Sequence, residues 1–206
     1  MPTDEAAPAP VAESELVLRP ADEDDADALA LIHLLARRAA PMPDPVHSDD
    51  DVRRWLRERV ADHAPGAETW VAEVEGVPVG YARTTAGWLD DLYVQPAHQG
   101  TGVGAALLDL ATARQPDGFC LWVFESNRPA REFYARHGLV ELERTDGSAN
   151  EEGEPDVRLA WPGQDPVAFL RGLVDEVDAQ LGDLLARRAA LTRAIQPLKS
   201  STRRDP

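Results

Sequence analysis

The sequence predicts a mixed α/β domain, with helices on both faces of its sheet, followed by one long helix. From Glu15 to Trp161, segments with the alternating pattern of β-strands are interleaved with segments that have the spacing of amphipathic helices. Their order is strand, two helices, three strands, helix, strand, helix and two strands, which is typical of a mixed sheet covered on both sides. After residue 163 the pattern changes to a heptad repeat.

The first elements of the domain are predicted to be one strand and two helices. Residues 15–19 alternate apolar and polar side chains before a proline, which indicates a strand. Leu29 and Ile32 begin a helical spacing that stops at the proline-rich loop 41–45. Ser48 is a suitable N-cap for the second helix.

Strands dominate the centre of the chain, and helices and strands alternate after the glycine-rich loop at 99–104. The expected strands lie at 69–74, 78–84, 88–94, 119–124, 139–144 and 157–161. The expected helices run through Leu107, Leu108 and Ala111 and from Pro129 to Arg136. The three strands before the glycine-rich loop follow one another closely enough to pair as a meander.

The C-terminal helix is predicted from Pro166 onward, because Asp165 is a plausible N-cap and proline suits the first helical position. Its apolar residues keep the strict 3.5-residue period of a coiled coil, with Arg188 as the one charged residue on the seam. The seam is made of Leu170, Val174, Val177, Leu181, Leu184, Arg188, Leu191, Ile195 and Leu198. Pro197 is expected to kink or end the helix.

The composition excludes some partners and a secreted disulfide scaffold. The net charge is -16, with 37 acidic against 21 basic residues, so no binding to nucleic acid or to an anionic membrane is expected, whereas a cationic substrate is easily accommodated. Cys120 is the only cysteine and neither a secretory signal nor a long apolar run is seen, which predicts a cytoplasmic protein. Residues 1–13, rich in Pro, Ala, Asp and Glu, are expected to be a disordered lead.

The loop Gln99–Gly104 follows a predicted strand and opens a predicted helix. Its glycines let the backbone approach a ligand closely, and its amides and the helix dipole favour an anion. A purely structural turn is the alternative that this loop alone leaves open.

Two motifs resemble the GCN5-related N-acetyltransferase (GNAT) family. Gln99-x-x-Gly102-x-Gly104 after Leu92-Tyr93-Val94-x-Pro96 resembles its acetyl-CoA signature. The segment Asn127–Leu139 resembles the family's Asn-x-x-Ala-x-x-Phe-Tyr-x-x-x-Gly-Phe segment, with Leu139 in place of the last Phe. The resemblance, which covers about residues 15–161, implies a mainly antiparallel GNAT sheet flanked by helices and an acetyl-CoA-dependent N-acetyltransferase.

The family resemblance implies roles for individual residues. Backbone amides from Gly100 to Gly104 would hold the pyrophosphate, and backbone groups of Leu92 and Val94 would pair with the pantetheine arm between two splayed strands. Tyr134 would be the general acid that protonates the departing thiolate, with a core aromatic as the alternative role. The cofactor-binding residues implied are Leu92, Tyr93, Val94, Gln99, Gly100, Thr101, Gly102, Val103, Gly104, Asn127 and Ala130.

The general base is left open among three carboxylates near the predicted splay: Asp90, Asp91 and Glu125. Strand alternation is expected to put Asp90 and Asp91 on opposite faces, so that at most one of them reaches the site. Any of the three is also compatible with an ordinary solvent-facing carboxylate.

The acceptor pocket is expected near the loop 145–156. This loop resembles a GNAT subgroup in which Asp-Gly-x-x-Asn-Glu-Glu precedes the last strand, so Asn150 and Glu151 become candidate substrate contacts. With His47 and Trp55 they would form an acidic and aromatic wall for a small amine. A mobile, solvated acidic loop is the alternative.

The C-terminal segment, from Phe169 to Lys199, also resembles the first helix of type II chorismate mutases. That resemblance implies that Arg171, Arg188 and Lys199 bind a chorismate-type dianion. The second and third helices of such a site do not follow, so three interpretations stay open. The helix is a dimerisation arm, a partial aromatic-carboxylate site completed by another subunit, or an amphipathic helix packed on the domain.

Together these observations predict a disordered lead at 1–13, a GNAT domain at 14–162 and a truncated chorismate-mutase-like arm at 163–206. The predicted reaction is direct acetyl transfer from acetyl-CoA to a primary amine of a small molecule or peptide in a ternary complex. No metal is expected, because the five histidines show no ligand spacing. A homodimer through the C-terminal helix is expected, and chorismate chemistry or a non-catalytic CoA- or partner-binding module are the alternatives.

Overall fold

The computed structural model describes residues 15–62 and 64–201, with side chains as far as Ile195. The lead predicted at 1–13 therefore lies outside the described residues, as does the side chain of Lys199. The strands are β1 (Leu16–Pro20), β2 (Glu68–Val74), β3 (Val77–Thr85), β4 (Trp88–Val94), β5 (Phe119–Phe124), β6 (Val140–Arg144) and β7 (Asp156–Trp161). The helices are α1 (Ala26–Ala39), α2 (Asp49–Val60), α3 (Val103–Arg114), α4 (Arg128–Arg136) and α5 (Pro166–Ser201), with short 3-10 turns at Glu23–Asp25 and Pro96–His98.

The seven strands form one sheet in the order β1-β2-β3-β4-β5-β7-β6. All neighbours are antiparallel except β4 and β5, which are parallel, and β2, β3 and β4 form the expected meander. The mixed, mainly antiparallel sheet predicted from the sequence is confirmed. Pro20 ends β1 at an edge of the sheet, where a missing backbone donor is tolerated.

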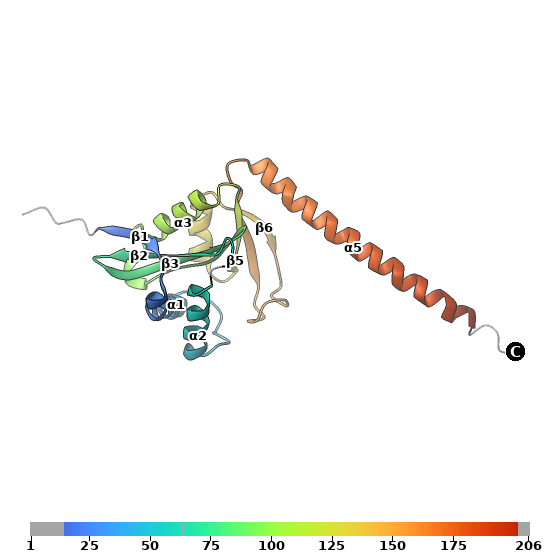
Figure 1. The fold of residues 1–206 in the computed structure, drawn as a ribbon, viewed down its shortest axis with the longest axis horizontal. Helices are drawn as coiled ribbons and strands as arrows, with labels where there is room; N and C mark the ends of the chain where they lie inside the picture. The colour runs from blue at the N-terminus through green and yellow to red at the C-terminus, as the bar shows by residue number, and fades with distance from the viewer. Residues whose placement is uncertain (1–14, 63, 202–206) are drawn as a thin grey trace, which may run out of the picture.

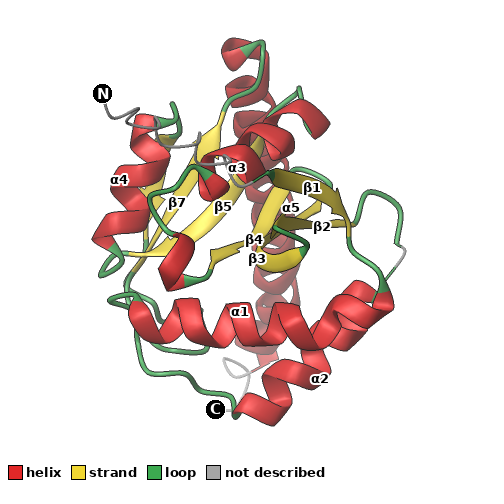
Figure 2. Ribbon diagram, turned by 90° about the vertical axis from the view of Figure 1, so that its left-hand side faces the viewer, coloured by secondary structure: helices red, strands yellow, loops and turns green. Residues whose placement is uncertain are grey.

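Helices cover both faces of the sheet, with α1 and α2 on one side and α3 and α4 on the other (Figures 1 and 2). On the first side, Leu29 and Ile32 of α1 pack with Leu56 of α2 against Val71 and Tyr81, which face each other in the β2–β3 pair. On the other side, α3 and Tyr134 of α4 contribute to a second apolar cluster with the opposite faces of the strands. Strand alternation thus supplies two cores from one sheet.

The helix α5 extends away from the domain as a single rod (Figure 1). Asp165 caps it by accepting a hydrogen bond from the amide of Ala168 at 3.0 Å, and the ring of Phe169 occupies the space that a side chain at Gly118 would need. The expectation that Pro197 ends the helix is wrong, because α5 continues to Ser201. None of the described helices is long and apolar enough to cross a membrane.

Candidate active site

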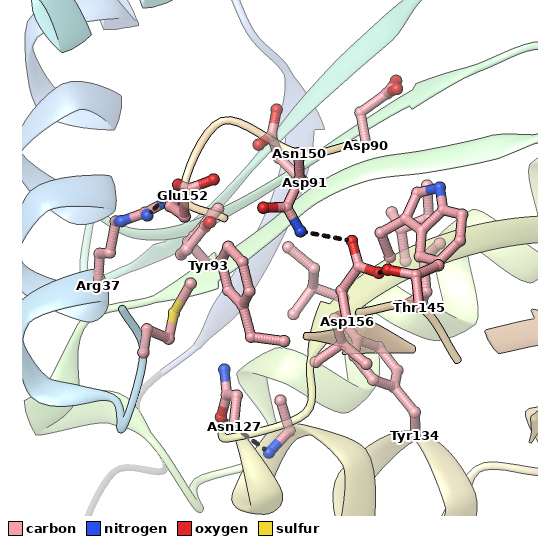
Figure 3. Close-up of a pocket in the computed structure, with 18 of the residues that line it drawn as sticks. Arg37, Asp90, Asp91, Tyr93, Asn127, Tyr134, Thr145, Asn150, Glu152 and Asp156 are labelled. Atoms are coloured by element: carbon pink, nitrogen blue, oxygen red, sulfur yellow. Dashed lines mark hydrogen bonds and ion pairs between the residues drawn. The ribbon is translucent and has the colours of Figure 1, made fainter. Parts of the chain in front are cut away.

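The sheet opens between β4 and β5. These parallel neighbours pair at only one position, Trp88 with Cys120, and beyond it the two strands diverge. A cavity of about 560 Å³ fills the gap, and side chains from α1, β4, β5, α4 and the loop before β7 line it. Figure 3 shows Tyr93, Asn127, Tyr134 and Asp156 around this space.

A β-bulge brings two adjacent carboxylates to the cavity. In the β3–β4 pair Arg83 lies opposite Asp91 and Thr84 lies opposite Leu89, so Asp90 is an extra residue without a partner in the register. Both Asp90 and Asp91 line the cavity. The expectation that only one of them reaches the site is wrong, because the bulge interrupts the alternation.

Asp91 is the enclosed member of the pair. Its side chain is 7% exposed, whereas that of Asp90 is 26% exposed, and burial raises the pKa of Asp91 to about 6. The guanidinium of Arg59, 3.1 Å from Oδ2, opposes that rise in pKa. The same guanidinium lies 4.5 Å from the ring centroid of Trp55, so α2 connects Asp91 to an aromatic side chain.

Tyr134 comes to the cavity from the buried face of α4. Burial raises the pKa of its phenol well above the ordinary value, so the hydroxyl keeps its proton at neutral pH. Its ring meets Phe133 edge to face at 5.2 Å. Asn127 caps the same helix, its Oδ1 accepting a hydrogen bond from the amide of Ala130 at 3.3 Å, and Asn127 and Ala130 both line the cavity.

The glycine loop has the conformation of an anion cradle. Gly100 and Gly102 have φ values of +76° and +96°, and a Cβ added at either would meet nothing within 4 Å. The helix α3 starts at Val103 with no side-chain cap and no acidic residue in its first turn. The loop and helix terminus therefore fit a diphosphate. They leave room for the ligand, and the backbone amides and the positive end of the helix dipole attract its negative charge.

The polar side chains of the glycine loop are turned back onto the protein. Gln99 donates from Nε2 to the carbonyl of Val94 at 3.1 Å, and Thr101 donates from Oγ1 to the carbonyl of His98 at 2.7 Å. The side chains of Gln99 and Thr101, which were expected to bind the cofactor, hydrogen-bond to backbone carbonyls and so stabilise the conformation of the loop. A Cβ added at Gly104 would lie 3.6 Å from the ring of Phe133, an ordinary van der Waals contact, so packing against Phe133 does not require glycine there.

A second cavity, of about 660 Å³, lies between the α1–α2 connection and the loop before β7. It shares Arg37, Met42 and Glu152 with the first cavity, so the two adjoin. Five carboxylate residues line it, together with the expected His47 and Trp55: Asp44, Asp49, Asp51, Glu151 and Glu152.

The expected acceptor residues have different roles in this wall. His47 Nε2 lies 2.7 Å from Glu151 Oε2, and both side chains are exposed. Asn150 instead shapes its loop, donating from Nδ2 to the carbonyl of Glu154 at 2.8 Å and to Asp156 at 3.0 Å.

Three candidate residues are not brought to the cavity. Glu125 pairs with Arg144 and does not line the cavity, so it is a weaker candidate base than Asp91. Arg171 and Arg188 are exposed on α5, roughly 26 Å apart along the helix axis, and so cannot converge on one ligand within one chain. The chorismate-type site suggested by the sequence gains no support from this arrangement.

Sequence reasoning missed the residues that organise the site. Arg37 pairs with Glu152 at 2.5 Å, and Thr145 donates to Asp156 at 2.5 Å, which ties the loop before β7 across the cavity. Arg59 was missed as well. No motif marks these residues, because their contacts join segments that are far apart in the sequence.

Comparisons with known proteins agree with this fold. The sequence matches the acetyltransferase (GNAT) family over residues 29–139. A mycothiol acetyltransferase from Amycolatopsis mediterranei is 31% identical over 186 residues, covering 75% of this chain but only 60% of the relative's own length. The peptidyl-lysine N-acetyltransferase YjaB from Salmonella typhimurium is 32% identical over 111 residues, covering 53% of this chain and 76% of the relative.

A solved structure shares the fold. The PaiA N-acetyltransferase from Thermoplasma acidophilum, crystallised in complex with coenzyme A, matches with a TM-score of 0.56 and 17% identity, covering 72% of this chain and 99% of its own. The family match extends over more than half of this chain and includes both the glycine loop and Tyr134. The chain belongs to the acetyltransferase (GNAT) family and is an acyltransferase that uses acetyl-CoA as its donor.

Proposed function

We propose that this protein transfers the acetyl group of acetyl-CoA to a primary amine by direct attack, with Asp91 as the general base and Tyr134 as the general acid. The observation that carries the proposal is the cavity at the β4–β5 splay. A buried carboxylate with a pKa of about 6 and a phenol that stays protonated line the same space.

The donor site in this proposal extends from the cavity to the glycine loop and uses mainly backbone groups. Amides from Gly100 to Gly104 and the N-terminus of α3 hold the diphosphate, and the splayed edge of β4 offers hydrogen bonds to the pantetheine arm. Asn127 adds its amide from the start of α4. Acetyl-CoA supplies the activated thioester, so the chain has to position it and move protons.

Two side chains move those protons. Asp91 is mostly ionised above pH 6 and takes a proton from the attacking amine, directly or through one water molecule. The amine nitrogen forms the new bond to the carbonyl carbon as the carbon–sulfur bond breaks. Tyr134 gives its proton to the departing sulfur, and its raised pKa favours its reprotonation from solvent. The products are an acetamide and free CoA.

The second cavity is the proposed entrance for the acceptor. Its five carboxylates outnumber its basic residues, Arg37, Arg38, His33 and His47, and the two arginines are paired with Glu152 and Asp49. Burial lowers the pKa of His33 to about 4, so that ring is neutral at pH 7. This surplus of negative charge and the ring of Trp55 favour an acceptor that carries positive charge, such as a lysine side chain or a polyamine. YjaB, by its name, acts on peptidyl-lysine.

Donor binding is tested by thermal unfolding with and without acetyl-CoA. Gly102→Glu should abolish the ligand-induced rise in Tm, because the new carboxylate occupies the open cradle and repels the diphosphate. Gly76→Glu is the matched control, since Gly76 also has a positive φ, +75°, and open space around it, but lies in the β2–β3 turn. An undiminished shift in Gly102→Glu would contradict this placement of the diphosphate.

The acceptor is tested by a screen of primary amines that follows release of free CoA thiol. Polyamines and lysine peptides should be acetylated faster than anionic amines such as glutamate. Faster turnover of the anionic amines would contradict the role given to the acidic wall.

A further inference from the structure

The seam of α5 is exposed although its spacing is that of a buried interface. We define the α5 seam as Leu170, Val174, Val177, Leu181, Leu184, Arg188, Leu191 and Ile195. Its apolar members are between 38% exposed at Leu170 and 66% exposed at Leu191. A continuous apolar stripe of this kind marks an interaction surface. A strict 3.5-residue period fits another helix in knobs-into-holes packing.

The charges of α5 are divided between its two halves. Apart from Arg171, the charged residues up to position 183 are acidic: Asp165, Asp175, Glu176, Asp178 and Asp183. From position 184 to the end of the described side chains they are basic: Arg187, Arg188 and Arg193. Two copies in the same direction would place like charges side by side, whereas two copies in opposite directions place each acidic half against a basic half.

The position of Arg188 on the seam also favours an antiparallel pair over a parallel one. In a parallel pair the two Arg188 side chains would meet in one layer, next to Arg187 of each copy. In an antiparallel pair each Arg188 lies opposite Val177 of the second copy. Asp178, which follows Val177 and flanks the seam on the same side, is then within reach of the guanidinium.

We propose that α5 pairs with α5 of a second copy of this chain as an antiparallel coiled coil. In the register that uses the whole seam, Leu181 packs against Leu184, Val174 against Leu191 and Leu170 against Ile195, each contact occurring twice. Arg188 pairs with Asp178 of the second copy. The interface extends for about 38 Å.

The rest of the molecule is compatible with this orientation. The domain is joined to the N-terminal end of α5, so an antiparallel pair puts the two domains at opposite ends of the rod (Figure 1). The chain has a net charge of -16, and this separation reduces repulsion between two acidic domains.

Orientation is tested by cysteine cross-linking in the full chain with two single variants, Val174→Cys and Leu191→Cys. Both sites are exposed, whereas the natural Cys120 is buried, so wild type is the background control. Under mild oxidation, cross-linked dimers should form when the two variants are mixed and not in either variant alone. Dimers in each variant alone would indicate a parallel pair, and no cross-link in any sample would indicate a monomer or a different partner; either result overturns the proposal.

The register is tested by exchanging the charges of the proposed pair. Arg188→Asp and Asp178→Arg should each weaken the dimer at least tenfold in sedimentation equilibrium, and the double variant should recover most of the loss. Asp183→Arg is the matched control, because Asp183 lies on the face of α5 away from the seam and should leave the dissociation constant within about threefold of wild type. Failure of the double variant to recover would overturn the Arg188–Asp178 pairing.

Discussion

The helices α3 and α5 both have regularly spaced apolar residues, but those of α3 are buried and those of α5 are exposed. In α3, Leu107 is fully buried against the sheet, whereas in α5 Leu191 is 66% exposed. The sequence period tells which face of a helix is apolar, but it does not tell what covers that face. The domain covers its own helices, while α5 needs a surface from elsewhere. Catalysis and stability should therefore depend on the first region and assembly on the second.

The largest expected difference between the two regions is in turnover. Tyr134→Phe should lower kcat at least 100-fold, because the phenol that protonates the leaving sulfur is removed. Arg193→Ala, at an exposed position of α5 off the seam, should leave kcat within about twofold of wild type. Steady-state release of CoA thiol measures both, and a retained acetyl-CoA thermal shift in Tyr134→Phe shows that the donor site is intact. Equal kcat in Tyr134→Phe and wild type would contradict the general-acid role.

The next difference is in the stability of the domain, tested with the same substitution in both helices. Leu107→Ala should lower the free energy of unfolding by about 2–5 kcal/mol, since it leaves a cavity in a closed core. Leu191→Ala should lower it by less than about 0.5 kcal/mol. Tryptophan fluorescence is a suitable probe, because all five tryptophans precede residue 162. Similar losses would mean that α5 packs on its own domain.

A smaller, pH-dependent effect should come from Asp91 within the domain. Its pKa is about 6 in the folded state and about 4 when unfolded, so the folded state holds the proton more tightly and loses stability as pH rises from 4 to 6. Asp91→Asn removes this cost and should unfold with a free energy up to about 2–3 kcal/mol higher than wild type above pH 7, with no difference near pH 4.

A carboxylate outside the site offers a control for this stability effect. Asp109→Asn should change the free energy of unfolding by less than about 0.5 kcal/mol at either pH, because Asp109 is exposed on α3. Urea titrations of wild type and both variants at pH 4 and pH 7.5 measure the differences. An Asp91→Asn effect that is the same at both pH values would show that burial of the ionised carboxylate is not its cause.

Much of the fold could be predicted from local patterns. Alternating residues, caps and glycine stops gave the strands and helices in their observed order, and the two family motifs indicated the donor loop and Tyr134. Pro197 does not end α5, which continues to Ser201, because the tendency of proline to break helices does not by itself decide where a helix ends.

The geometry of the site could not be predicted in the same way. The bulge at Asp90 follows from a register shift between two strands and leaves no glycine or other sign in the sequence. The contact between Arg59 and Asp91 depends on how α2 packs against the sheet, and the tie between Arg37 and Glu152 joins residues more than 100 positions apart. Such contacts are properties of the tertiary structure, so single-sequence patterns do not report them.

The general-base role of Asp91 is tested most directly by the pH dependence of kcat/KM for acetyl transfer to the best acceptor, in wild type and in Asp91→Asn. The wild-type kcat/KM should increase as a group with a pKa of about 6 ionises. The ratio of kcat/KM in wild type to kcat/KM in Asp91→Asn should therefore rise with pH up to about pH 6 and then level off at about 100 or more. A ratio that stays near one from pH 5 to 8 would contradict the role of Asp91 and with it the proposed mechanism.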